Sequence, residues 1–210
     1  MGALNSTSTQ SLPKSPAADV QAALTALTQP ISRAHVSSAV QVDLSGLYLV
    51  GADLRGADLT ESDLRETDLG GARLRGAKLT KALLWRARLS RAWMREATLT
   101  GAWLREADLS RGLLEGADLS DTKLGQANLT SADLRKAILA RSDLMDVHLE
   151  SGIGGLANLS GADLRGADLQ SALVTVEQVV AARLSRDTAL PSDIAGDDRV
   201  SARIVQGGGS

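Results

Sequence analysis

The sequence predicts an all-β solenoid, a rod of stacked coils built from five-residue steps. The first observation is a strict period: from Leu44 to Leu169, every residue whose number ends in 4 or 9 is Leu, except Met94 and Gly154. The second is a small residue, usually Ala, two positions before these leucines. The third is a core without rings, because the 210 residues include no Phe, one Tyr and three Trp. Leu and Ala therefore point inward together, and the polar residues between them point outward.

The period of five excludes the two common elements. A helix would repeat its apolar residues near every 3.6 positions, and a flat strand would alternate them. A step of five instead lets the backbone turn a corner each time, so that each step forms one short side of a coil. Neighbouring coils then pair at about the 4.8 Å spacing of strands. Glycines suit this turning backbone, and they occur at Gly46, Gly51, Gly56 and Gly71.

The run GADLRGADLT at residues 51–60 shows the pattern most plainly, and the pattern extends over about Val42 to Ala172. In this respect the chain resembles the pentapeptide-repeat family. The resemblance implies a right-handed quadrilateral β-helix with four steps per coil, about six and a half coils and roughly 30 Å long. Residues twenty apart then share a face. The four-step coil therefore predicts a column of hydroxyl residues, formed by Thr60, Thr80, Thr100, Ser120 and Ser160. It predicts a column of arginines on another face, formed by Arg65, Arg105 and Arg165.

An open solenoid leaves unpaired backbone at each end, so we expect a short α-helical cap on both sides of the repeats. Residues 1–14 are rich in Ser and Thr and are expected to be disordered. Residues 15–41 are expected to form the first cap and a linker. In this segment Ser15 is the expected N-cap and Pro16 the first helical residue, and the apolar face consists of Val20, Leu24 and Leu27.

After the repeats, placed at residues 42–173, we expect the second cap and a tail at 174–206. Thr175 and Gln178 match a capping box. Residues 186–206 are predicted to be an extended tail, and residues 207–210 resemble an appended linker. In several members of the family the C-terminal end also forms a homodimer. The apolar face available for the cap or a dimer is Val176, Val179, Val180 and Leu184.

Charge is uneven along the predicted rod although the formal net charge is only −2. Residues 43–69 carry seven acids and two bases, residues 70–111 three acids and ten bases, and residues 112–172 nine acids and five bases. The middle is therefore a basic belt between acidic ends. All three Trp lie in this belt, at outward positions where they should be exposed. Exposed Trp beside Arg is typical of protein interfaces, and the candidate partner-binding residues are Leu83, Trp85, Arg86, Arg88, Trp93, Arg95, Trp103, Arg105 and Leu113.

The sequence contains no constellation that predicts catalysis, a cofactor or a metal. There is no Cys, which excludes disulfides and thiolate sites and fits a reducing cytoplasm. The two histidines, His35 and His148, are far apart. The run at residues 152–155 is rich in glycine but precedes no Lys-Ser/Thr and opens no helix, so we expect a bend or bulge rather than a phosphate loop. No segment is apolar enough to span a membrane.

Three functions compete. The first, from the residues, is a non-catalytic interaction or scaffold module that presents the belt to a protein partner or a second copy. The second, implied by the resemblance, is a DNA mimic that binds gyrase or topoisomerase IV and protects it from quinolones or a toxin. The basic belt fits that role poorly, because mimicry needs a broadly acidic surface. The third is nucleic-acid binding through Arg and Trp in the belt, which the flanking acids disfavour.

Overall fold

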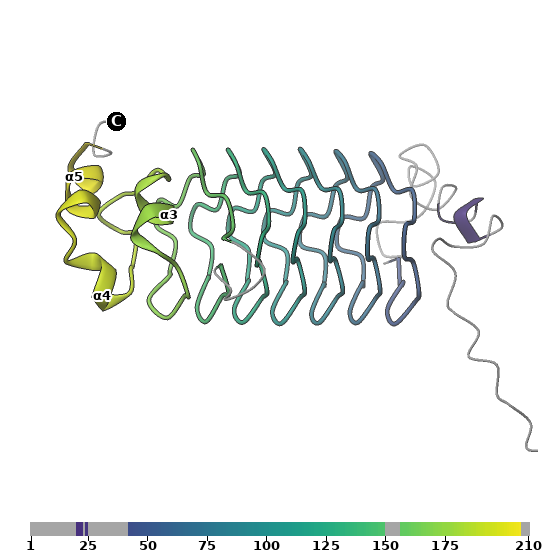
Figure 1. Ribbon diagram of the computed structural model, residues 1–210. Helices are drawn as coiled ribbons and strands as arrows, with labels where there is room; N and C mark the ends of the chain where they lie inside the picture. Colours follow the sequence, from purple (N-terminus) through teal and green to yellow (C-terminus); the bar gives the residue numbers. More distant parts are fainter. Residues whose placement is uncertain (1–19, 23, 25–41, 150–155, 207–210) are drawn as a thin grey trace, which may run out of the picture.

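The computed structural model describes residues 20–22, 24, 42–149 and 156–206. Figure 1 shows a straight rod of stacked coils, with helices α3, α4 and α5 at its C-terminal end. The sequence expectations for residues 1–14, Ser15, Pro16, Leu27, His35 and residues 207–210 lie outside the described residues. No helix in the described part of the chain has the length and apolar content needed to cross a membrane.

Each coil consists of four five-residue steps, as expected. Parallel bridges join residues twenty apart, from Asp43 with Asp63 to Asn128 with His148. The bridging residue of each step is the one before the inward Leu, and the Leu N–H donates to the next coil. For example, the Leu64 N–H donates to the Leu83 carbonyl oxygen over 2.8 Å. The sides of the coils are thus single bridged residues rather than long strands, because a corner follows within two residues.

The core is a column of leucines, one per step. The inward Leu residues are 0–4% exposed, and Met94, which replaces one of them, is fully buried. The alanines two positions earlier fill the space between the leucines and the coil wall. Where a hydroxyl residue replaces Ala, it is buried and donates to a backbone carbonyl oxygen, as Ser62 does to Leu59 over 2.6 Å. This hydrogen bond removes the cost of burying an unpaired hydroxyl.

The corners explain the glycines. In the described repeat from 42 to 149, the second residue after each inward Leu has a positive φ, as does its counterpart in the later steps at Gly161 and Gly166. Glycine adopts this conformation without strain, whereas other residues pay about 1–2 kcal/mol. Nine of these corners are glycine and fourteen are not. The rod therefore accepts this strain at many corners, because the coil-to-coil hydrogen bonds hold the backbone there.

The Asp of the repeat also has a structural role. The backbone N–H of the residue after Leu takes no part in the coil-to-coil pairing, and the side chain two residues earlier accepts its hydrogen bond. Every Asp or Asn before an inward Leu does so, with N–O distances of 2.9–3.4 Å across the set Asp43, Asp53, Asp58, Asp63, Asp68, Asp108, Asp118, Asn128, Asp133, Asp143, Asn158, Asp163 and Asp168. These carboxylates close the backbone, so they are not free groups on the surface.

The register changes at the glycine-rich segment, and this corrects the expected columns. The bridges that span it join residues twenty-five apart, as in Asp133 with Asn158 and Asp143 with Asp168. The Ala157 N–H donates to the Leu149 carbonyl oxygen, a bond that elsewhere joins residues three apart. One whole step is therefore left out of the stack. Residues 150–155 themselves lie outside the described residues, but everything after them is displaced by one face.

Two expected columns are consequently wrong at their last members. Ser160 stacks after Arg135, since the Lys136 N–H donates to the Ser160 carbonyl oxygen, and so it does not continue the hydroxyl column. Arg165 stacks after residue 140 instead of continuing the column of Arg65 and Arg105. Within the hydroxyl column, Thr100 Oγ1 donates to Asp118 Oδ2 over 2.9 Å.

A glutamine side chain closes the exposed backbone at the start of the rod. In the described part of the helical segment around residue 20, Leu24 is 3% exposed and Val20 is 40% exposed. The Gln21 amide donates to the Asp53 carbonyl oxygen over 2.7 Å and accepts from the Asp53 N–H over 2.8 Å. It thereby replaces both hydrogen bonds that a preceding coil would make.

At the other end, helix α3 spans Val176–Val180 and has the expected capping box between Thr175 and Gln178. The Gln178 side chain also donates to the carbonyl oxygens of Leu149 and Ala157, each over 3.0 Å, at the place where the register changes. Of the apolar residues expected to face the rod, Val179 and Leu184 are buried, while Val176 and Val180 are partly buried.

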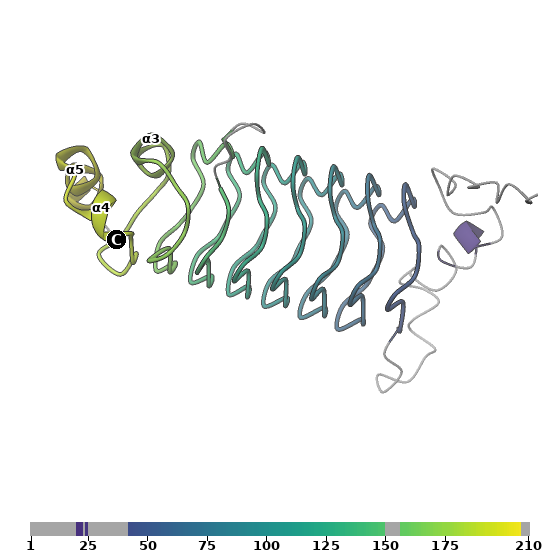
Figure 2. The same ribbon diagram turned by 60° about the horizontal axis from the view of Figure 1, so that its bottom comes forward.

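The prediction of an extended tail is wrong. Helix α4 spans Ser192–Ala195 and helix α5 spans Asp198–Gln206, and both lie beyond α3 at the end of the rod (Figure 2). Ile194 and Val200 are buried, at 4% and 0% exposure, and α5 packs on α3. The two helices form because they cover apolar surface that a single extended segment would leave open.

Candidate protein-binding surface

The nine candidate residues do not form one surface. Leu83, Trp85, Trp103 and Arg105 lie on one face of the rod, which we call the Trp103 face. Trp93, Leu113 and Arg95 lie on the opposite face: the bridge between Trp93 and Leu113 places these two in one column, which is two of the four steps of a coil away from the column of Leu83 and Trp103. Arg86 occupies the corner beside the Trp103 face, and Arg88 lies on the next face, where it bridges Asp68 and Asp108.

The Trp103 face carries the larger apolar cluster. Leu83 and Trp103 bridge each other on adjacent coils, and Trp103 is 56% exposed. Together with Trp85, Arg65, Arg105 and Glu106, they line a depression of about 450 Å³. A depression with an indole at its rim and an aliphatic floor is suited to a large apolar side chain.

Trp85 is less exposed than expected, because its neighbours hold it. The Arg86 guanidinium lies 4.2 Å from the centre of the Trp85 ring, and Trp85 Nε1 donates to Glu106 Oε1 over 3.3 Å. Arg86 Nε also donates to Glu106 Oε2 over 2.7 Å. These hydrogen bonds, first from Arg86 and then from Trp85, lower the pKa of Glu106. Trp85 is therefore a fixed wall of the depression, while Trp103 is its exposed edge.

The opposite face combines Trp93 with ion-paired charged residues. Trp93 is 54% exposed and adjoins Leu113 on the next coil. Beside them, Arg95 pairs with Glu115 at 3.0 Å, and Arg135 pairs with the same carboxylate at 3.4 Å. The charged groups beside Trp93 thus already have partners.

Ion pairs between coils neutralise much of the basic belt. Six of its ten bases lie within 4.0 Å of a carboxylate on a neighbouring coil, namely Arg73, Arg75, Lys81, Arg86, Arg88 and Arg95. The other four make no ion pair with a described carboxylate, namely Lys78, Arg91, Arg105 and Arg111. The belt therefore presents a few separate cations rather than a continuous positive field.

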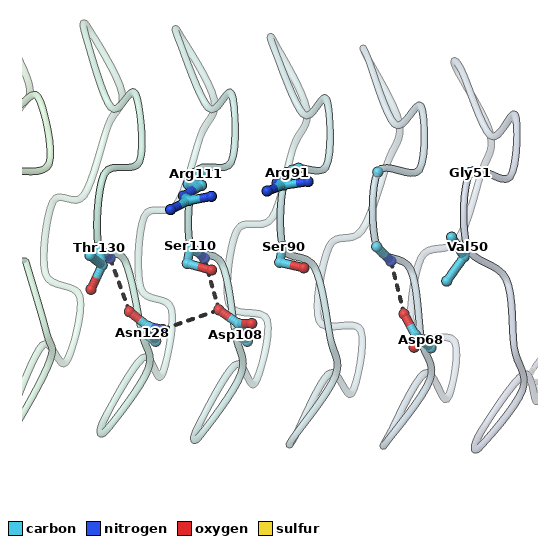
Figure 3. A pocket seen from close by; sticks show the side chains of 12 residues that line it. Val50, Gly51, Asp68, Ser90, Arg91, Asp108, Ser110, Arg111, Asn128 and Thr130 are labelled. Carbon is cyan, nitrogen blue, oxygen red and sulfur yellow. Dashed lines mark hydrogen bonds between the residues drawn. The ribbon is translucent and has the colours of Figure 1, made fainter. Parts of the chain in front are cut away.

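A second, larger hollow of about 820 Å³ follows the face of Ser90 along several coils. Figure 3 shows Arg91 and Arg111 along one side of it and Asp68, Asp108 and Asn128 along the other. The carboxylate of Asp108 on the acidic side is already hydrogen-bonded within the protein, because its Oδ1 accepts from the Ser110 N–H and from Asn128 Nδ2. The sequence analysis missed this hollow, although small residues recur there every twenty positions, at Gly70, Ser90, Ser110 and Thr130.

The belt differs from the rest of the rod in what it lacks. Seven consecutive steps have no Asp or Asn before the inward Leu, and their residues at that position are Arg73, Lys78, Leu83, Arg88, Trp93, Thr98 and Trp103. The backbone N–H groups two residues later make no hydrogen bond with any described residue. In the four steps before this run, Asp53, Asp58, Asp63 and Asp68 accept all such bonds. The repeat's local hydrogen bond is thus replaced by large outward side chains over nearly two coils.

The described residues offer little for chemistry. They contain no cluster of three or more His, Asp or Glu side chains that could hold a metal ion. His148 lies in a column of bridged residues between Asn128 and Leu173, away from the Trp103 face.

Comparisons with known proteins agree with the repeat. A model of pentapeptide repeats matches residues 40–76, 72–111, 113–150 and 156–173 in eight copies. A trypsin-treated variant of QnrB1, a plasmid-mediated fluoroquinolone resistance protein, is similar in structure, with a TM-score of 0.59 and 21% identity over 71% of this chain and 75% of that chain. HetL, a pentapeptide repeat protein involved in heterocyst differentiation regulation in the cyanobacterium Nostoc, is 31% identical over 75% of this chain and 86% of its own, with a TM-score of 0.25. No curated protein matches the chain.

Proposed function

The chain belongs to the pentapeptide repeat family, and from this premise we propose that it is a non-catalytic interaction module that binds a protein partner through the Trp103 face. Members of this family are generally structural or interaction modules. The observation that carries the proposal is the run of seven steps without the local Asp. Large side chains there replace a hydrogen bond that the fold uses elsewhere, and such departures from a local rule are expected at functional sites.

The composition of the Trp103 face supports a protein partner. Trp and Arg are the residues most enriched among those that dominate binding energy at interfaces. Leu83 and Trp103 give the face an apolar centre, and Arg65 and Arg105 give it a polar rim. The rod beneath is held by a hydrogen bond at nearly every step, so binding costs little ordering of the backbone.

The test uses a random-peptide library displayed on phage and selected on the immobilised protein. Selected peptides are then measured by fluorescence polarisation against three proteins: the wild type, Trp103→Asp and Trp93→Asp. Both substitutions restore the repeat's own residue, so the fold should survive, and circular dichroism checks that it does. We expect Trp103→Asp to weaken binding about 30-fold or more, as for loss of a central Trp, and Trp93→Asp to leave it within about threefold. Equal binding to Trp103→Asp and the wild type would refute this function.

The topoisomerase alternative stays a prediction. It is supported by the acidic composition of residues 43–69 and 112–172, and it is opposed by the local use of the aspartates described above. A supercoiling assay of gyrase with a fluoroquinolone, with and without the protein, separates the two. Protection or inhibition in that assay, unaffected by Trp103→Asp, would favour mimicry over the function proposed here.

A further inference from the structure

Arg105 is an exception among the arginines of the rod. Seven arginines directly follow an inward residue, which is Leu in six cases and Met94 in one: Arg55, Arg65, Arg75, Arg95, Arg105, Arg135 and Arg165. Four of them bind the Asp two residues before, and two bind a Glu of the next coil. Arg105 alone in this set has no ion pair with a described carboxylate. It lines the depression of the Trp103 face together with Arg65, whose guanidinium is already bound by Asp63.

The missing partner has a clear cause on both sides of Arg105. Where its Asp would stand, the sequence has Trp103. On the next coil, where Arg75 and Arg95 find a Glu, it has Gly125 and Gln126. Arg105 Nε lies 3.7 Å and Asp143 Oδ2 lies 3.8 Å from the place a Cβ on Gly125 would occupy. Asp143 accepts a hydrogen bond from the Met145 N–H and makes no ion pair with Arg105, and residue 125 itself has no side chain that could bind the guanidinium.

Backbone donors accompany the guanidinium. The N–H groups of Trp85, Arg105 and Gly125 follow one another along the rod on this face, about 4.8 Å apart. None makes a hydrogen bond with a described residue, because Leu83, Trp103 and Lys123 stand where the acceptors would be. Lys123 adds a cation beside Trp103, to which it is bridged. Glu106, the carboxylate at the rim, is already engaged by Trp85 and Arg86.

The same face shows what this donor set binds. At Asp63, Oδ1 accepts from the Arg65 N–H over 3.1 Å and from Arg65 Nε over 2.9 Å, and Oδ2 accepts from Arg65 Nη2. Asp163 binds Arg165 in the same way. In both, the hydrogen bonds from the arginine lower the carboxyl pKa. A carboxylate is thus the natural ligand of an arginine and an N–H in this arrangement.

We propose that the Trp103 face recognises a partner segment in which an Asp or Glu lies next to a large apolar residue. The carboxylate binds the Arg105 guanidinium and backbone N–H, as Asp63 binds Arg65. The apolar side chain enters the depression between Trp85 and Trp103, over Leu83. This inference rests on the proposed function and adds the chemistry of the partner to it.

The test analyses the peptides selected on the wild-type protein. We expect them to carry Asp or Glu beside Leu, Ile, Met, Phe or Trp, and we expect replacement of that acid by its amide to weaken binding. Arg105→Ala should weaken it about tenfold to a hundredfold, because hydrogen bonds to charged groups contribute about 1.5–3 kcal/mol. Arg111→Ala is the matched control, since it removes an equally unpaired cation from another face, and it should change binding less than about twofold at 150 mM salt.

The outcomes separate the two proposals. Binding that requires Trp103 but is unchanged by Arg105→Ala, or peptides without acid enrichment, would overturn this inference and leave the proposed function standing. Equal losses in Arg105→Ala and Arg111→Ala would mean a general charge effect and would also overturn it. If no selected peptide depends on Trp103, both proposals fail.

Discussion

Restoring one missing acceptor in the belt should stabilise the rod. Lys78 stands where the repeat has Asp or Asn, makes no ion pair with a described carboxylate, and leaves the Thr80 N–H without a hydrogen bond to any described residue. Asn128 and Asn158 show that a neutral amide can serve, since their Oδ1 atoms accept the corresponding N–H over 3.1 and 3.0 Å. We therefore expect Lys78→Asn to recreate this hydrogen bond.

The magnitude follows from one partly solvated hydrogen bond. Its net contribution is about 0.5–1.5 kcal/mol, and the lower half applies because the Thr80 N–H exchanges a water for the new acceptor. For a chain of this size each kcal/mol raises the unfolding midpoint by about 2–4 °C, so we expect a rise of about 1–4 °C. The reference is Lys78→Ala, which removes the same lysine without supplying an acceptor.

The assay is thermal unfolding followed by circular dichroism, with amide hydrogen exchange at Thr80 as a local readout. Lys78→Asn should exceed Lys78→Ala in midpoint and should slow exchange at Thr80. If the two variants melt together and Thr80 exchanges at the same rate, the side-chain acceptor is not what closes this corner. The explanation for the Asp of the repeat, and for the cost of the belt, would then be wrong.

Three further predictions concern the register, the first coil and pH. Deleting residues 151–155 should keep the fold, because Ala157 would then follow Leu149 by three residues, as in an ordinary step. Deleting only residues 152–155 would break the five-residue period and should unfold the last coils. Circular dichroism and limited proteolysis would distinguish the two variants. Gln21→Ala should accelerate amide exchange at Asp53 about tenfold, because it removes the N–H acceptor. Arg165 lowers the folded-state pKa of Asp163. The ionised carboxylate therefore stabilises the fold above pH about 4, and this stabilisation is lost as the pH falls further. Asp163→Asn should accordingly lose less stability than the wild type between pH 5 and 3, as measured by thermal unfolding.

The stacked coils were predictable because each step repeats the same local rule. The inward Leu recurs with few exceptions, so the period of five could be read from any part of the array, and the columns up to residue 149 followed from it. The sequence predicted a bend or bulge at residues 152–155, but the change of register was not predictable. An extra segment of five residues leaves every inward Leu in phase in the sequence, and only the coil-to-coil bridges reveal that Asp133 pairs with Asn158 rather than with residue 153.

The C-terminal helices escaped prediction for a different reason. Helices α4 and α5 have four and nine residues and are separated by Gly196 and Asp197. Helices this short have little stability of their own. They form because Ile194 and Val200 bury themselves at the end of the rod, and that surface exists only once the coils have stacked. The apolar pattern of α3 was recognisable because a capping box marks its start.

The candidate site shows where counting charges was insufficient. The excess of bases in residues 70–111 suggested a positive belt, but residues twenty apart are neighbours in space, so most of these bases meet acids from adjacent coils. The informative signal was instead the Asp that is missing from seven consecutive steps. A missing Asp leaves two donors at once, a backbone N–H and, at Arg105, a guanidinium. Since Trp103 also supplies apolar surface at that point, the same substitution creates both parts of the proposed binding site.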